Sequence, residues 1–100
     1  MIRHIVMFRF AEEADGRSKQ ENLEFARNKL LALPEVIPEI KSFEVHLNCN
    51  LNGTNCDICA SGDYENLDDL EAYRVHPAHK AVGIFMRAVA EQRAAFDFEV

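Results

Sequence analysis

The sequence lacks several features that would assign it to a specialised class. No apolar segment approaches the roughly 20 residues needed to span a bilayer, and the first residues, MIRHIVMFRF, alternate with charges and do not resemble a signal peptide. The eleven Lys and Arg form no run and the net charge is -6, which argues against nucleic-acid binding. The three cysteines, an odd number without a secretion signal, indicate free thiols. We therefore expect a cytoplasmic protein with no membrane or nucleic-acid partner.

What the sequence does contain is typical of one ordinary globular domain. It has 100 residues, of which 48% are hydrophobic and 28% charged. No internal repeat, linker or low-complexity tract divides it. We expect a single domain over residues 1–100 with a modest hydrophobic core.

Hydrophobic periodicity predicts the elements of the first half. Residues 2–10 alternate with period two and predict a strand. Ser18 and Glu21 have the spacing of a capping box at a helix start. Leu23, Ala26, Leu30 and Leu33 form the apolar stripe of that helix, which Pro34 ends. The segment between the strand and the helix, AEEADGR, is expected to be a loop.

The second half repeats the alternation of strands and helices. Strands are expected at residues 40–49 and 56–62, joined by a turn in NLNGTN at residues 50–55. Asn66 can cap a second helix, which Pro77 interrupts before a further helix, and the chain closes on an alternating strand in AAFDFEV. The order β-α-β-β-α-β predicts an α+β, ferredoxin-like fold, with helices on one face of an antiparallel sheet.

The first strand has an apolar residue pattern on both of its faces. Val6 and Phe8 share one face, while Ile5 and Met7 lie on the other, which the helices do not cover. An open apolar face needs a covering surface. We therefore predict a homodimer in which two sheets pack face to face with twofold symmetry.

Four segments carry a resemblance to a known family. IRHIVMFRF, IPEIKSFEVHLN, CDICASGDYENLDDLEAYRVHPAH and FDFE occur in the order, and over nearly the whole length, seen in the stress-responsive A/B barrel domain (Dabb) family. The resemblance implies a ferredoxin-like subunit that forms a dimeric α/β barrel. It implies little about activity, because most members of the family have no established reaction.

A plant polyketide cyclase of this family, olivetolic acid cyclase, suggests candidate catalytic residues. The resemblance carries its cavity pattern to His4 and Tyr73, its general base to His79, and the aspartate that orients this base to Asp97. It also turns Asp97 towards the helices, whereas burial alone would turn Phe96 and Phe98 that way. Two departures count against the same chemistry: Ile58 replaces a cavity histidine, and no tyrosine stands between Phe25 and Leu33.

Each candidate also has a structural reading. His79 can serve as a base or can satisfy backbone groups where the helix restarts after Pro77. His4 can line a cavity or be a hydrogen-bonded core residue, Tyr73 can pack or present its hydroxyl, and His76 is expected to be a surface or capping residue. The residues expected to line a cavity between helices and sheet are His4, Val6, Phe8, Ile58, Tyr73, His79 and Val82.

Metal and redox functions are not expected, and no cofactor is implied. Cys56 and Cys59 have C-x-x-C spacing, but on a strand they point to opposite faces and no second cysteine pair exists. Three functions stay open: binding of a small, largely apolar molecule, a cyclase- or lyase-like enzyme with His79 as base, and a structural dimer without a ligand.

Overall fold

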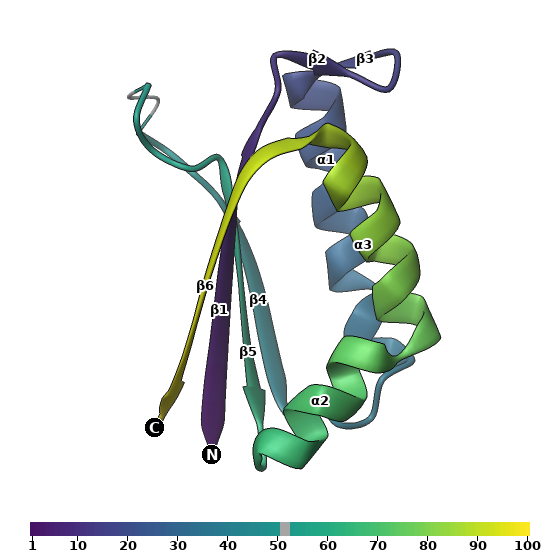
Figure 1. Ribbon diagram of the computed structural model, residues 1–100, viewed down its shortest axis with the longest axis vertical. Coiled ribbons are helices and arrows are strands. Elements are labelled where there is room, and N and C mark those ends of the chain that lie inside the picture. The colour runs from purple at the N-terminus through teal and green to yellow at the C-terminus, as the bar shows by residue number, and fades with distance from the viewer. Residues whose placement is uncertain (51–52) are drawn as a thin grey trace.

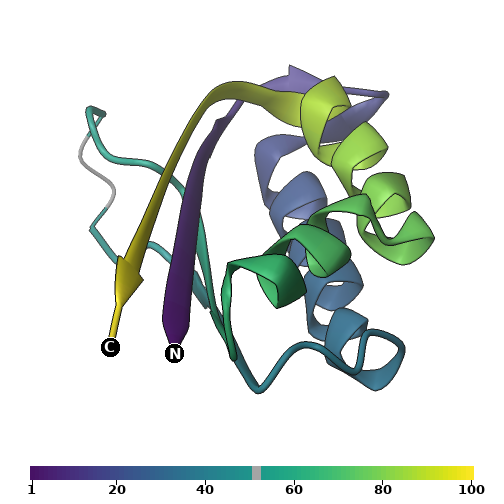
Figure 2. The ribbon, with the colours of Figure 1, turned by 60° about the horizontal axis from the view of Figure 1, so that its bottom comes forward.

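The computed structural model describes residues 1–50 and 53–100 and consists of two layers (Figures 1 and 2). One layer is a four-stranded antiparallel sheet, and the other consists of helices that cover one of its faces. In chain order the elements are β1 (Ile2–Phe10), β2 (Glu13–Ala14), β3 (Arg17–Ser18), α1 (Lys19–Leu31), the 3-10 helix η1 (Leu33–Glu35), β4 (Ser42–Leu47), β5 (Ile58–Tyr64), α2 (Leu67–Val75), α3 (Pro77–Val89) and β6 (Ala90–Glu99).

The strands are ordered β4-β5-β1-β6, and every neighbouring pair is antiparallel. This arrangement confirms the predicted α+β, ferredoxin-like fold. The observed strands differ from the predicted ranges by a few residues at their ends, and β6 begins earlier than expected, immediately after α3. In the sheet, His4 on β1 lies directly between Gly62 on β5 and Asp97 on β6.

Local side-chain caps explain where the helices begin. The Ser18 hydroxyl accepts a hydrogen bond from the Glu21 amide, and the Glu21 carboxylate accepts from the Ser18 amide, so the predicted capping box is present. The Asn66 side chain accepts from the Asp69 amide at the start of α2. His76 ends α2 and caps α3, because its Nδ1 accepts from the Ala78 amide at 3.0 Å. Pro77 occupies the first turn of α3, where its missing N–H is tolerated.

The segment expected to be a loop after β1 contains a small hairpin, so that prediction was incomplete. β2 and β3 pair antiparallel around Asp15 and Gly16. Both turn residues have positive φ, 56° at Asp15 and 77° at Gly16, which is the geometry that favours Asp-Gly in two-residue hairpins. Within the turn predicted at residues 50–55, Leu51 and Asn52 lie outside the described residues.

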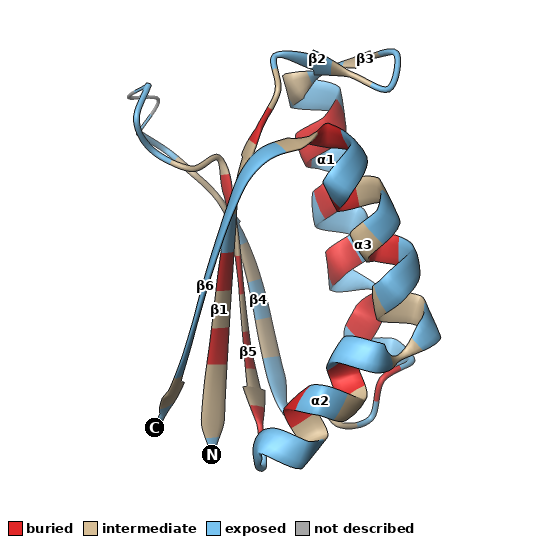
Figure 3. Cartoon of the chain, in the orientation of Figure 1, coloured by how far each residue is buried: buried red, intermediate tan, exposed pale blue. Residues whose placement is uncertain are grey.

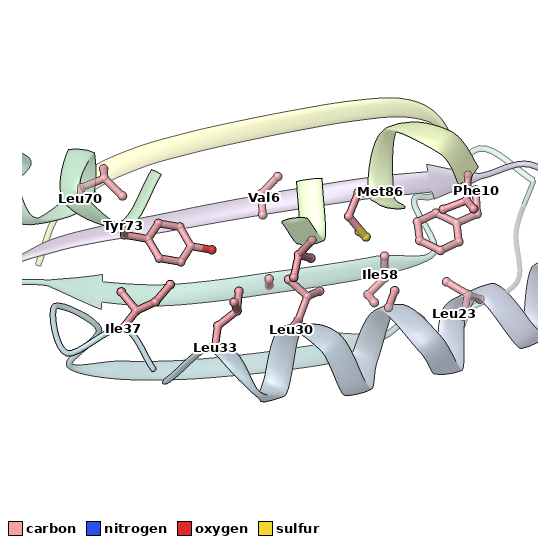
Figure 4. Packing of buried hydrophobic residues seen from close by; sticks show 14 of the residues in the cluster. Val6, Phe10, Leu23, Leu30, Leu33, Ile37, Ile58, Leu70, Tyr73 and Met86 are labelled. Atoms are coloured by element: carbon pink, nitrogen blue, oxygen red, sulfur yellow. The ribbon is translucent and has the colours of Figure 1, made fainter. Parts of the chain in front are cut away.

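The hydrophobic core fills the space between the helices and the sheet (Figures 3 and 4). The predicted apolar stripe of the first helix, Leu23, Ala26, Leu30 and Leu33, is buried throughout, although α1 ends at Leu31 and Leu33 lies in η1. The opposite sheet face contacts no helix. There Met7 is 39% exposed and Phe96 67% exposed, and nearly all of β6 is solvent-accessible (Figure 3). Phe96 and Phe98 therefore point away from the helices, as the resemblance implied, and Asp97 points towards them.

None of the helices formed by residues 1–50 and 53–100 is both long enough and apolar enough to cross a membrane.

Candidate functional site

A cavity of about 310 Å³ lies between β1, the first part of β6 and helices α1, α2 and α3. Its floor is the helix-facing side of β1, where His4, Val6 and Phe8 follow each other at every second position. Its walls come from the α2–α3 break and from α3. The complete lining is His4, Val6, Phe8, Leu30, Tyr73, Arg74, His79, Val82, Gly83, Met86, Arg87 and Arg93. The cavity thus combines an apolar interior with two imidazoles, one phenol and three guanidinium groups.

The structure brings six of the seven expected cavity residues together and leaves one aside. Ile58 is 2% exposed and faces the helices, but it does not line this cavity. It lies on β5 directly opposite Phe8 of β1 and belongs to the hydrophobic core (Figure 4). The expectation for Ile58 is not met, because the cavity lies over β1 and β6 and no β5 residue lines it. Side-chain alternation fixes the face of a sheet but not which strands lie beneath a cavity.

His79 lies beside Tyr73, with the two ring centroids 4.4 Å apart. Its Nδ1 lies 3.0 Å from the carbonyl oxygen of Arg74. A carbonyl can only accept, so Nδ1 carries the proton and Nε2 holds the free lone pair in the neutral ring. Burial lowers the pKa of His79 below its usual value. His79 is therefore a neutral imidazole near pH 7, oriented by a backbone carbonyl.

Asp97 contacts His4 rather than His79. Its Oδ1 lies against Nδ1 of His4, the residue directly opposite on β1. The His4 side chain is 11% exposed and that of Asp97 is 46% exposed, so the pair joins a buried ring to the solvent-facing edge of the sheet. The expected arrangement, with Asp97 orienting His79, is replaced by two separate pairs: Asp97 with His4, and the Arg74 carbonyl with His79.

Tyr73 connects the two imidazoles. Its ring is 6.4 Å from that of His4, in an edge-on arrangement, and the residue is 2% exposed. Figure 4 shows the hydroxyl of Tyr73 pointing into the space between the sheet and the helices. Burial raises the pKa of Tyr73 to about 12, so the phenol keeps its proton at neutral pH and can donate a hydrogen bond.

Three arginines of the lining, Arg74, Arg87 and Arg93, were not predicted from the sequence. Arg74 forms two hydrogen bonds to the Glu71 carboxylate, at 2.9 and 3.1 Å. Arg87 and Arg93 have no carboxylate partner among the described residues. The spacing in the sequence could have indicated the positions of Arg87 and Arg93. Arg87 lies one helical turn after Gly83, and Arg93 shares a strand face with Asp97.

Other parts of the described chain do not form a comparable site. A hollow of about 370 Å³ beside the β4–β5 connection includes Met7, His46 and Cys59, but it opens on the sheet face that the helices leave bare. Burial raises the pKa of Cys59, which is the opposite of what a reactive thiol requires. Residues 1–50 and 53–100 contain no group of three or more His, Cys, Asp or Glu side chains placed to hold a metal ion.

Comparison with solved structures places this architecture among dimeric proteins. A dimeric ferredoxin-like protein of unknown function from Bacteroides fragilis is 32% identical, with a TM-score of 0.84 over 99% of this chain and 95% of that chain. A dimeric ferredoxin-like protein of unknown function from Thermobifida fusca is 29% identical, with a TM-score of 0.84 over 99% of this chain and 90% of that chain. These similarities support a homodimer.

A plant enzyme has the same fold at lower sequence similarity. Hydroxynitrile lyase from Passiflora edulis is 13% identical, with a TM-score of 0.82 over 99% of this chain and 92% of that chain. No curated protein matches the chain. The model of the Stress responsive A/B Barrel Domain (Dabb) matches residues 2–100. The chain therefore belongs to the stress-responsive A/B barrel domain family.

Proposed function

We propose that the protein is a homodimer that binds a small molecule with an apolar body in the cavity between helices and sheet. The observation that carries the proposal is the cavity of about 310 Å³, in which Val6, Phe8 and Val82 meet the polar groups of His4, Tyr73 and His79. Mostly apolar walls with a few convergent polar groups are the usual composition of small-molecule sites. A structural dimer without a ligand would not require such a space.

The proposed dimer interface is the bare sheet face. It carries Ile5 and Met7 of β1 and Phe96 and Phe98 of β6, with the Phe96 and Phe98 rings 5.9 Å apart. A second copy on this face would bury these side chains and leave the helix-covered cavity free in each subunit. We also propose a cytoplasmic location for this single domain over residues 1–100, supported by its three free cysteines, Cys49, Cys56 and Cys59.

Titration calorimetry with the neutral ketone 2-acetylnaphthalene tests the binding proposal. The substitution Val82→Phe places a larger ring in the cavity lining, and we expect it to lower affinity at least tenfold, which corresponds to about 1.4 kcal/mol. Ile84→Phe is the matched control, because Ile84 is 66% exposed on the same helix and does not line the cavity. Thermal denaturation verifies that both variants fold, and Phe8→Trp provides a second cavity-filling variant. Absence of binding, or equal binding by all variants, would favour the structural dimer.

A second candidate function is an enzyme of the cyclase or lyase type. It is favoured by the hydrogen-bonding of the two imidazoles, since Nδ1 of His79 donates to a carbonyl and Nδ1 of His4 faces a carboxylate. Each ring can then present Nε2 to the cavity. His79 would remove a proton next to a carbonyl group. The Tyr73 hydroxyl, or His4 in its doubly protonated form, would donate a hydrogen bond to the carbonyl oxygen as the electron pair moves onto it.

The same ketone tests this second candidate, because its methyl group has acidic protons. In deuterated water, a base that removes a methyl proton gives an enolate, and a deuteron from solvent then returns to carbon. We expect faster deuterium incorporation with the wild-type protein and loss of the acceleration in His79→Gln. His46→Gln is the control, because His46 lies on the bare sheet face. Binding of the ketone without faster deuterium incorporation would support the binding function and contradict the enzymatic one.

A further inference from the structure

We infer that the ligand of the cavity is an organic acid, whose apolar body fills the interior and whose carboxylate is held at the mouth by Arg87 and Arg93. The inference rests on the proposed binding function and adds the chemical class of the ligand. Both arginines line the cavity, and neither has a hydrogen bond or ion pair to a carboxylate within residues 1–50 and 53–100.

Arg87 is held at the mouth by the helix geometry of α3. Gly83 lies one turn earlier on the same helix and also lines the cavity. A Cβ atom at Gly83 would lie 3.3 Å from Nη1 of Arg87, so the guanidinium occupies the space that the missing side chain leaves open. The glycine thus allows the positive charge to lie close to the helix surface at the cavity.

Arg93 approaches from the sheet. It lies opposite Phe8 in the β1–β6 register, on the face that carries His4 and Asp97. At Tyr73, burial raises the pKa and the nearby charge of Arg93 partly opposes this increase. At His79, burial lowers the pKa and the charge of Arg93 lowers it further. The positive charge of Arg93 therefore acts on groups inside the cavity and not only at the molecular surface.

The third arginine of the lining and the carboxylate beside His4 are already paired. Arg74 is bound to Glu71, and Asp97 is bound to His4. The two free guanidinium groups thus leave a local excess of positive charge in a protein whose net charge is -6. Guanidinium groups bind carboxylates through charge-assisted, often bidentate hydrogen bonds. A neutral apolar ligand would leave both arginines without a partner.

A matched pair of ligands tests the inference. Naphthalene-2-carboxylate and 2-acetylnaphthalene have nearly the same shape, and only the first carries a negative charge. We expect calorimetry at low salt to show that the wild-type protein binds the carboxylate about tenfold more tightly than the ketone, a difference of about 1.4 kcal/mol. Because both arginines are exposed, the preference should decrease as salt is raised.

Charge-removing variants identify the groups responsible. Arg87→Gln and Arg93→Gln should each reduce the affinity for the carboxylate by a larger factor than the affinity for the ketone. Lys80→Gln is the control, because it removes the same charge from an exposed position of α3 outside the cavity lining. Equal affinity for the two compounds, or a preference that both arginine variants retain, would overturn the inference alone. Absence of binding of either compound would instead contradict the proposed function on which the inference rests.

Discussion

Replacement of Gly83 by alanine should stabilise the fold and impair the site. Gly83 lies within α3, where glycine is less favourable than alanine by about 0.8–1.0 kcal/mol. The added methyl group would contact only Arg87, with Nη1 at 3.3 Å and Cζ and Nη2 at 4.0 Å. These atoms form the end of a flexible, exposed side chain, which can move by a few tenths of an ångström. We therefore expect a net stabilisation of about 0.5–1 kcal/mol.

For a domain of this size, such a change raises the melting temperature by about 2–8 °C. Thermal denaturation at fixed protein concentration measures it, because a dimer has a concentration-dependent melting temperature. The reverse exchange at Ala81, an exposed position of the same helix outside the cavity lining, gives the matched control. Ala81→Gly should destabilise by about 1 kcal/mol without changing ligand binding.

The functional effect of Gly83→Ala has the opposite sign. The methyl group displaces the Arg87 guanidinium and narrows the cavity mouth, so the preference for naphthalene-2-carboxylate over the ketone should fall. A substitution that stabilises the fold but weakens the binding preference is expected at a position that serves function rather than folding. A destabilised Gly83→Ala, or one that is stabilised with unchanged carboxylate preference, would refute this account of Gly83.

Three other perturbations follow from the structure. At Gly62, an added Cβ would lie 2.9 Å from Oη of the fully buried Tyr64 and 3.0 Å from Phe43, so Gly62→Ala should lower the free energy of unfolding by about 1–3 kcal/mol, whereas Gly53→Ala, where no atom of residues 1–50 and 54–100 other than its chain neighbours comes within 4 Å, should change it little in urea denaturation. Because burial lowers the pKa of His79 in the folded state, the unfolded chain binds its proton first, and stability should be lost as pH falls from about 7 through the folded-state pKa. His79→Gln should show a flatter pH dependence in that range, and identical curves would contradict the burial of the ring. Phe96→Glu on the bare sheet face should dissociate the dimer in light scattering, and an unchanged dimer mass would place the interface elsewhere.

The fold could be predicted from the sequence because its signals are local. Alternation in residues 2–10 fixed the two faces of β1, and the spacing of Ser18 and Glu21 fixed the start of α1. Pro77 showed where the second helical segment breaks, and His76 was correctly expected to cap or lie at the surface there. The Asp15-Gly16 turn had an equally local signal, although the segment was interpreted as a loop.

The partners in the site could not be predicted, because they depend on strand register. Asp97 meets His4 since β1 and β6 pair with these residues opposite each other, and the pairing includes a shift between Arg9 and Phe10. Periodicity shows only that Asp97 lies on the face opposite Phe96 and Phe98. It shows neither that this face is towards the helices nor which of two histidines Asp97 meets. Register also decides that Arg93 reaches the cavity. Ile58 lies outside it because the cavity forms over β1 and β6 rather than over β5, which alternation alone does not show.

Methyl NMR of the three methionines tests the central proposal most directly. Met86 lines the cavity and is 3% exposed, whereas Met7 lies on the bare sheet face. With methyl-labelled methionine and 2-acetylnaphthalene, we expect a shift of the Met86 methyl signal and nuclear Overhauser effects between this methyl and the naphthalene protons, with no such contacts at Met7. Contacts at Met7 without contacts at Met86, or no contacts at either, would contradict a ligand site between the helices and the sheet.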